Sequence, residues 1–249
     1  MYPEINLGPV TLQTFGLMFA LAFLAAGALI ARRLAEIDKP VDWAYEMGFA
    51  ALAGGIVGSR VYFIVQNYDS VKDDLLGNLF SGAGLVWYGG AIGGAIAILL
   101  WAWWRGFLGL ALLDLAATPL ALGYAIGRVG CQVSGDGDYG QPSDLPWAMS
   151  YPDGTVPTTD RVHPTPIYES LAMGLVAWLL WTLRDRFAPG LLFALYLVLS
   201  GLERFLVEFI RRNDEVWAGL TVPQIESLAL MVIGLGWIAV ASRRRAVFA

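Results

Sequence analysis

The sequence predicts an all-α integral membrane protein that crosses the bilayer about seven times, with its N-terminus outside and its C-terminus in the cytoplasm. Hydrophobic residues make up 57% of its 249 residues and charged residues 15%, with a mean hydropathy of +0.59. Soluble proteins carry about 25% charged residues. In lipid only helices and closed barrels satisfy the backbone, and the chain lacks the alternating strands of a barrel. We expect one transmembrane domain over residues 1–249.

The individual spans follow from the lengths of the apolar stretches. A spanning helix needs about 20 mostly apolar residues. Such stretches are predicted at about 12–31, 44–66, 84–104, 110–133, 165–183, 190–210 and 221–241. A polar, glycine-rich loop at about 134–164 separates the fourth stretch from the fifth.

The orientation follows from the basic residues, which are enriched in cytoplasmic loops. They follow the first, third, fifth and seventh spans, as Arg32, Arg33, Lys39, Arg105, Arg184, Arg186 and Arg243 to Arg245. Most acidic loop residues lie in the alternate loops, which places the 134–164 loop on the outer face. Arg211 and Arg212 follow the sixth span on that outer side and are exceptions to the rule.

Several ionisable residues fall inside the predicted spans, where each one costs about 2.5–3.5 kcal/mol at the helix centre. Glu208 follows Arg204 by four residues, so the two share a helix face and can pair. Arg60 and Arg128 add two further cations, so we expect surplus positive charge facing the interior. Because guanidinium groups bind phosphate in a forked geometry, the surplus predicts a site for an anionic ligand.

Structural interpretations compete with this one. Arg60 and Arg128 lie near the outer ends of their spans, where they could form buried pairs or reach the head groups. A lone loop histidine such as His163 more often hydrogen-bonds than catalyses. The single cysteine, Cys131, belongs to a residue type that usually packs.

The glycine pairs and the glycine-rich loop also have plain interpretations. Gly54-Gly55, Gly58, Gly89-Gly90 and Gly93-Gly94 are typical of close helix packing. The segment from Gly135 to Gly140 can be a flexible turn, although its two aspartates could ligate a cation. A hard cation such as Ca²⁺ or Mg²⁺ binds more oxygen ligands than this segment offers, so we predict no metal site here. The net charge of −5 argues against nucleic-acid binding.

Several short polar motifs occur in a fixed order along the chain. They are Gly58-Ser59-Arg60, Trp87-Tyr88-Gly89-Gly90, Gly127-Arg128-Val129-Gly130, Asp138-Tyr139-Gly140, His163-Pro164, Ile167-Tyr168-Glu169 and Arg204 to Arg211. No single motif is decisive, but the ordered series resembles the prolipoprotein diacylglyceryl transferase family along nearly the whole chain.

The resemblance implies a multi-pass enzyme of the bacterial cytoplasmic (inner) membrane that catalyses the first step of lipoprotein maturation. Such an enzyme transfers the sn-1,2-diacylglyceryl group of phosphatidylglycerol to the lipobox cysteine thiol in a prolipoprotein signal peptide. A thioether forms, glycerol phosphate is released, and no cofactor is implied. The departing phosphate develops negative charge, which positioned guanidinium groups stabilise.

The resemblance also assigns roles to residues. Arg128 and Arg204 would hold the phosphate, with Arg60 as a further candidate, and Glu208 would orient Arg204. The expected catalytic residues are Arg128, Arg204, Glu208, Tyr88 and His163. The expected substrate-binding residues are Arg60, Arg128, Gly89, Gly90, Asp136, Asp138, Tyr139, Gly140 and Arg211.

Three positions depart from the family pattern. Tyr88 stands where many members have histidine, Phe15 where tyrosine is frequent, and Cys131 where asparagine is frequent. The general base therefore stays open between Tyr88 and His163, and we expect the arginines to do most of the thiol activation. One alternative is a paralogous lipid-group transferase with another acceptor. The other is a transporter for an anionic solute, against which the absence of an internal repeat weighs.

Overall fold

A computed structural model of the chain describes residues 1–71 and 86–247. It divides into two compact units. Unit 1 comprises Met1–Leu29 together with Leu113–Ala249, and unit 2 comprises Ile30–Leu112. The first two residues of the predicted 84–104 span lie outside the described residues.

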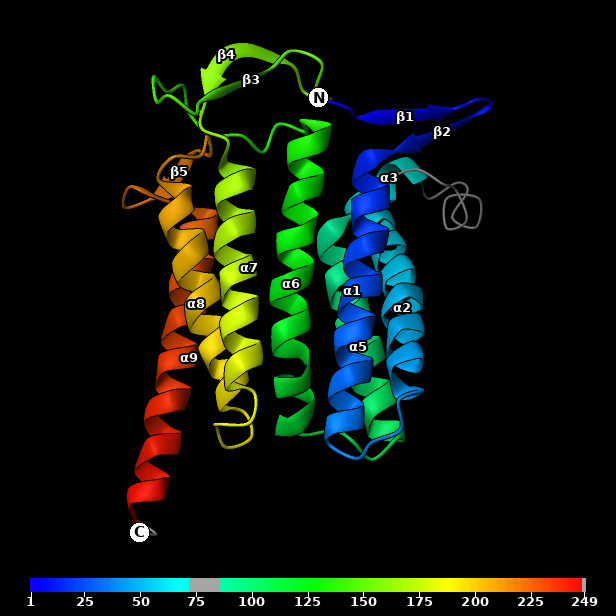
Figure 1. The fold of residues 1–249 in the computed structure, drawn as a ribbon, viewed down its shortest axis with the longest axis vertical. Helices are drawn as coiled ribbons and strands as arrows, with labels where there is room; N and C mark the ends of the chain where they lie inside the picture. Colours follow the sequence, from blue (N-terminus) through cyan, green and yellow to red (C-terminus); the bar gives the residue numbers. More distant parts are fainter. Residues whose placement is uncertain (72–85, 248–249) are drawn as a thin grey trace. The chain divides into compact units, whose positions relative to one another are not determined.

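Seven helices of 18 residues or more occur in the described ranges, and each coincides with a predicted span (Figure 1). They are α1 (Thr14–Glu36), α2 (Trp43–Gln66), α5 (Trp87–Trp104), α6 (Leu110–Ser134), α7 (Thr165–Leu183), α8 (Leu191–Glu208) and α9 (Val222–Val247). Five of them, α1, α2, α6, α7 and α9, are long and apolar enough to cross a membrane, and a shorter apolar helix covers Tyr88–Trp104. The predicted all-α polytopic fold is confirmed, whereas the number of crossings and their orientation stay predictions.

The segments outside the long helices contain short elements that the sequence did not reveal. A short helix, α3, spans Tyr68–Val71. Three antiparallel hairpins pair β1 (Glu4–Leu7) with β2 (Val10–Gln13), β3 (Met149–Tyr151) with β4 (Thr158–Val162), and β5 (Glu215–Trp217) with β6 (Leu220–Thr221). All three hairpins belong to unit 1 and lie at the end of its helices where α6 finishes (Figure 1). Strands of two to five residues are too short to produce a clear alternating pattern.

In unit 1, α6, α7 and α8 pack through small residues. Ala117, Ala121 and Ala125 form a buried ridge at four-residue spacing on α6, and Met173 of α7 packs in the same cluster. Small side chains let helix backbones approach closely. Asp114 accepts hydrogen bonds from the backbone N–H groups that begin α8, with distances of 2.6 and 2.9 Å. This contact satisfies donors that a helix start leaves unpaired.

In unit 2, α2 and α5 pack backbone against backbone. A Cβ atom built at Gly58 would lie 2.3 Å from the carbonyl oxygen of Gly89, and one at Gly54 would lie 2.5 Å from that of Gly93. No side chain fits at such distances. The packing interpretation of these glycines is therefore confirmed.

Candidate functional site

Three arginines and three carboxylates form one connected ion-pair cluster in unit 1. The cluster is made of Arg128 on α6, Asp138 in the following loop, Glu169 on α7, Arg204 and Glu208 on α8, and Arg211 just after α8. The α6–α7–α8 packing brings these residues together from positions far apart in the sequence.

Glu169 is the centre of the cluster and is fully buried. Its carboxylate lies 3.1 Å from Nε of Arg128 and 3.4 Å from Nη1 of Arg204. Nη1 of Arg211 is also 3.4 Å away. The hydroxyl of Tyr124 donates a further hydrogen bond of 3.1 Å to Glu169. Because one carboxylate faces all three guanidinium groups, it offsets their mutual repulsion and fixes their separation.

Asp138 joins two of the same arginines from the loop after α6. Its Oδ2 atom pairs with Nη1 of Arg128, and its Oδ1 atom pairs with Nη2 of Arg211. Burial acts to raise the pKa of Asp138, but the two guanidinium groups outweigh it and hold that pKa below its usual range. The carboxylate is therefore ionised at neutral pH.

Glu208 holds Arg204 from the opposite side. Its Oε2 atom lies 2.8 Å from Nη2 of Arg204, so the predicted pair on one helix face is present. Its Oε1 atom accepts hydrogen bonds of 2.6 Å from Asn213 and 2.8 Å from Thr221. Glu208 is thus fixed by the segment after α8, and it can orient Arg204.

This cluster has no surplus of positive charge; the expected surplus counted Arg60, which belongs to unit 2, and left out Arg211. The three arginines are matched by three carboxylates, because Asp138 and Glu169 supply two negative charges that the count of intramembrane residues overlooked. In the sequence, Glu169 stands out only as the last residue of the Ile167-Tyr168-Glu169 motif. Its place inside the predicted 165–183 span was the missed signal, since an intramembrane carboxylate needs a cationic partner.

The two basic residues that broke the loop-charge rule are held by this part of the protein. Arg211 is 9% exposed and belongs to the cluster. Arg212 donates from Nε to the carbonyl of Gly140 at 2.8 Å, and its guanidinium lies 4.9 Å from the ring of Tyr139. Both residues therefore serve local contacts, which explains basic residues on the predicted outer side.

Gly140 lies where the loop after α6 meets the start of α7 and the end of α8. Its backbone N–H donates to the carbonyl of His163 at 2.8 Å. A Cβ atom at Gly140 would lie 2.4 Å from the carbonyl oxygen of Ile210 and 2.9 Å from Cβ of His163. Only glycine fits there, so Gly140 contributes through backbone packing.

Tyr139 and His163 flank this junction. The Tyr139 ring stacks on Tyr151 with a centroid distance of 4.8 Å, and its hydroxyl donates to the carbonyl of Val156 at 3.1 Å. His163 packs edge-on against Tyr168. Its buried Nδ1 atom has no hydrogen-bond partner among the residues that the structure describes.

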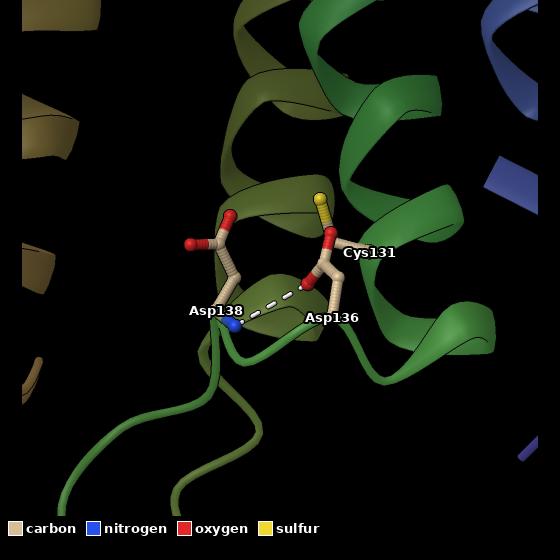
Figure 2. Close-up of side chains that lie close together, drawn as sticks. All are labelled: Cys131, Asp136 and Asp138. Carbon is tan, nitrogen blue, oxygen red and sulfur yellow. Dashed lines mark hydrogen bonds between the residues drawn. The ribbon is translucent and has the colours of Figure 1, made fainter. Parts of the chain in front are cut away.

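Cys131, Asp136 and Asp138 gather at the end of α6, with one ligand atom from each within 4.8 Å of the others (Figure 2). These residue types could hold a metal ion. The Asp138 carboxylate, however, already pairs with two arginines, so a cation would compete with Arg128 and Arg211 for it. Asp136 accepts a 3.3 Å hydrogen bond from the backbone of Asp138, drawn as the dashed line in Figure 2.

The remaining expected site residues belong to unit 2. Arg60 is buried on α2, with its guanidinium 6.0 Å from the ring of Phe63. Tyr88 lies in the first turn of α5 and is 53% exposed. Gly89 is a packing residue of the α2–α5 seam, and Gly90 is next to it with ordinary clearance of 3.4 Å.

Comparisons with known proteins identify the family of this chain. The family model described as prolipoprotein diacylglyceryl transferase matches residues 4–240. A phosphatidylglycerol–prolipoprotein diacylglyceryl transferase of Clostridium tetani is 33% identical over 91% of this chain and 95% of its own length. Proteins of the same name from Pseudomonas fluorescens and Methylococcus capsulatus are 30% and 31% identical over at least 97% of this chain and 95% of their own lengths. The chain therefore belongs to the prolipoprotein diacylglyceryl transferase family.

Proposed function

We propose that the chain transfers the sn-1,2-diacylglyceryl group of phosphatidylglycerol to the lipobox cysteine of a prolipoprotein, in the bacterial inner membrane. The observation that carries this proposal is the cluster of three arginines in unit 1 of a family member with several apolar helices. Guanidinium groups recognise phosphate through paired hydrogen bonds. Membership of this family also favours a transferase over a transporter.

The reaction is a direct displacement of phosphate by the thiolate, so the enzyme has to stabilise the charge of the departing phosphate and needs no covalent intermediate. The acceptor thiolate attacks a glyceryl carbon, the new C–S bond forms as the C–O bond to phosphate breaks, and the electron pair leaves with the phosphate oxygen. Arginines aimed at that oxygen lower the barrier because the negative charge grows there during the step. The same positive field favours the thiolate form of the acceptor, which is the nucleophile.

The cluster suits this role because its arginines are already fixed. Glu169 and Glu208 are fully buried as side chains and hold Arg204 from two directions. Fixed dipoles and charges need no reorganisation when the transition state forms. Tyr88 and His163 remain candidates for the group that accepts the thiol proton.

The direct test uses purified protein, phosphatidylglycerol with a labelled glycerol backbone, and a lipobox peptide in detergent. We expect mass spectrometry to detect a thioether-linked diacylglyceryl group on the peptide cysteine, together with glycerol phosphate. The matched peptide with serine in place of cysteine should stay unmodified. Absence of the thioether product from folded, lipid-binding protein would refute the proposal.

A further inference from the structure

Asp138 differs from the other two carboxylates of the cluster. The side chains of Glu169 and Glu208 are 0% exposed and come from helices, whereas that of Asp138 is 34% exposed and comes from a loop. Gly135 and Gly137, with φ angles of 61° and 96°, shape that loop. Asp138 is thus the carboxylate that can leave the cluster by turning towards solvent.

The contacts of Asp138 are those that a phosphate group would make. One carboxylate oxygen pairs with Arg128 and the other with Arg211. A phosphodiester likewise presents two equivalent oxygens that share one negative charge. The two guanidinium groups that converge on Asp138 could therefore accept a lipid phosphate in the same manner.

The charge balance of the cluster favours a phosphodiester that replaces the Asp138 carboxylate over one that binds beside it. The three arginines and three carboxylates sum to zero. A phosphodiester bound beside Asp138 would leave one uncompensated negative charge in a largely buried site, which is costly. A phosphodiester that replaces Asp138 keeps the sum at zero.

The exchange requires little movement of the backbone. Thr165 donates from its hydroxyl to the backbone carbonyl of Asp138 at 2.6 Å. Two residues after Asp138, the backbone N–H of Gly140 donates to the backbone carbonyl of His163. With the main chain fixed on this side, rotation about the side-chain bonds of Asp138 is enough to move its carboxylate away from the arginines.

We propose that Asp138 is an internal substitute for the head-group phosphate of the lipid donor. In the free protein it keeps Arg128 and Arg211 in place, and on lipid binding it rotates out and the phosphate takes its position. The inference rests on the proposed function and deepens it. It selects Arg211 as the partner of Arg128 at the phosphate, while Arg204, held by carboxylates that do not leave, becomes a positioning residue.

The test measures lipid affinity without any acceptor peptide. In Asp138→Asn, which keeps the shape of the side chain and removes its charge, the Kd for dioctanoylphosphatidylglycerol should fall at least about threefold, because no internal anion competes. Asp153→Asn, at an exposed carboxylate of the same outer loop, should bind like wild type. An unchanged or raised Kd in folded Asp138→Asn protein would overturn the proposal.

Two further ligands, dioctanoylglycerol and glycerol phosphate, show which part of the lipid the two arginines recognise. We expect dioctanoylglycerol, which lacks phosphate, to gain nothing from Asp138→Asn, and an equal gain for it would overturn the proposal. Free glycerol phosphate separates a lipid source from a soluble one. A gain confined to glycerol phosphate, with none for the lipid, would contradict the assignment to the lipid donor.

A measurement on wild-type protein covers the case in which Asp138→Asn fails to fold. Carbodiimide labelling of the Asp138 carboxyl, read by peptide mass spectrometry, should rise at least about threefold in saturating phosphatidylglycerol, because the exchange exposes it. Unchanged or reduced labelling would overturn the proposal. Increased labelling without thioether product in the peptide assay would refute the proposed function alone, and normal transfer without increased labelling would refute the exchange alone.

Discussion

Replacement of Glu169 by glutamine tests the central carboxylate of the cluster. The substitution preserves side-chain volume but removes a negative charge that is fully buried and faces three arginines. Two carboxylates would then face three guanidinium groups, leaving one buried positive charge uncompensated. Breaking a buried pair in this way costs about 3–5 kcal/mol. We expect a loss of stability in that range and a fall in transfer activity of at least about tenfold, because the arginines lose alignment.

The control is Glu226→Gln on α9, since Glu226 is exposed and makes no ion pair with any described residue. Its loss of stability should stay below about 1 kcal/mol, as for substitutions outside buried ion pairs. Reversible unfolding in mixed micelles, followed by tryptophan fluorescence, compares the two variants. Equal stability of Glu169→Gln and Glu226→Gln would show that the cluster does not depend on Glu169.

Five other substitutions address the chemistry. Arg128→Lys loses a guanidinium fork at the phosphate, and Arg204→Lys loses one that positions the cluster, so each should lower kcat/KM at least about tenfold. Wild-type rates in both variants would show that neither Arg128 nor Arg204 acts in the reaction. Cys131→Ser should retain most activity, because the nucleophile is the substrate's thiol; a lipid thioether on Cys131 during turnover would indicate a covalent enzyme intermediate instead. His163→Ala should lower activity moderately with an unchanged pH–rate profile, and Tyr88→Phe should lose less than about tenfold. If the pH–rate profile of His163→Ala lost its inflection near neutral pH, His163 would be the base. If Tyr88→Phe lost more than about a hundredfold in activity, Tyr88 would be the base.

The helices were predictable because membrane spans have a strong one-dimensional signal. All seven predicted spans coincide with long helices, since about 20 apolar residues identify a span regardless of the surrounding fold. The hairpins were missed because their two- to five-residue strands carry too little pattern. Their positions depend on packing between loops, which the sequence does not display.

The candidate site was predictable in its members but not in its charge balance. Arg204 and Glu208 could be paired because four-residue spacing on one helix is a local relation. The meeting of Glu169 with Arg128 and Arg211 depends on how α6, α7 and α8 pack, so it could not be derived from spacing. The misplaced basic residue Arg211 was nevertheless a visible signal, because it violated the loop-charge rule at a position that proves to be buried.

The most direct measurement of the central claim locates the lipid head group on the protein. A phosphatidylglycerol analogue with a photoreactive glycerol head group is irradiated with the purified protein, and the crosslinked peptides are sequenced by mass spectrometry. The account predicts crosslinks in the segments 128–140 and 204–213, which contribute most of the ion-pair cluster, and their loss when excess unlabelled phosphatidylglycerol competes. Crosslinks that compete in the same way but map outside both segments would contradict it.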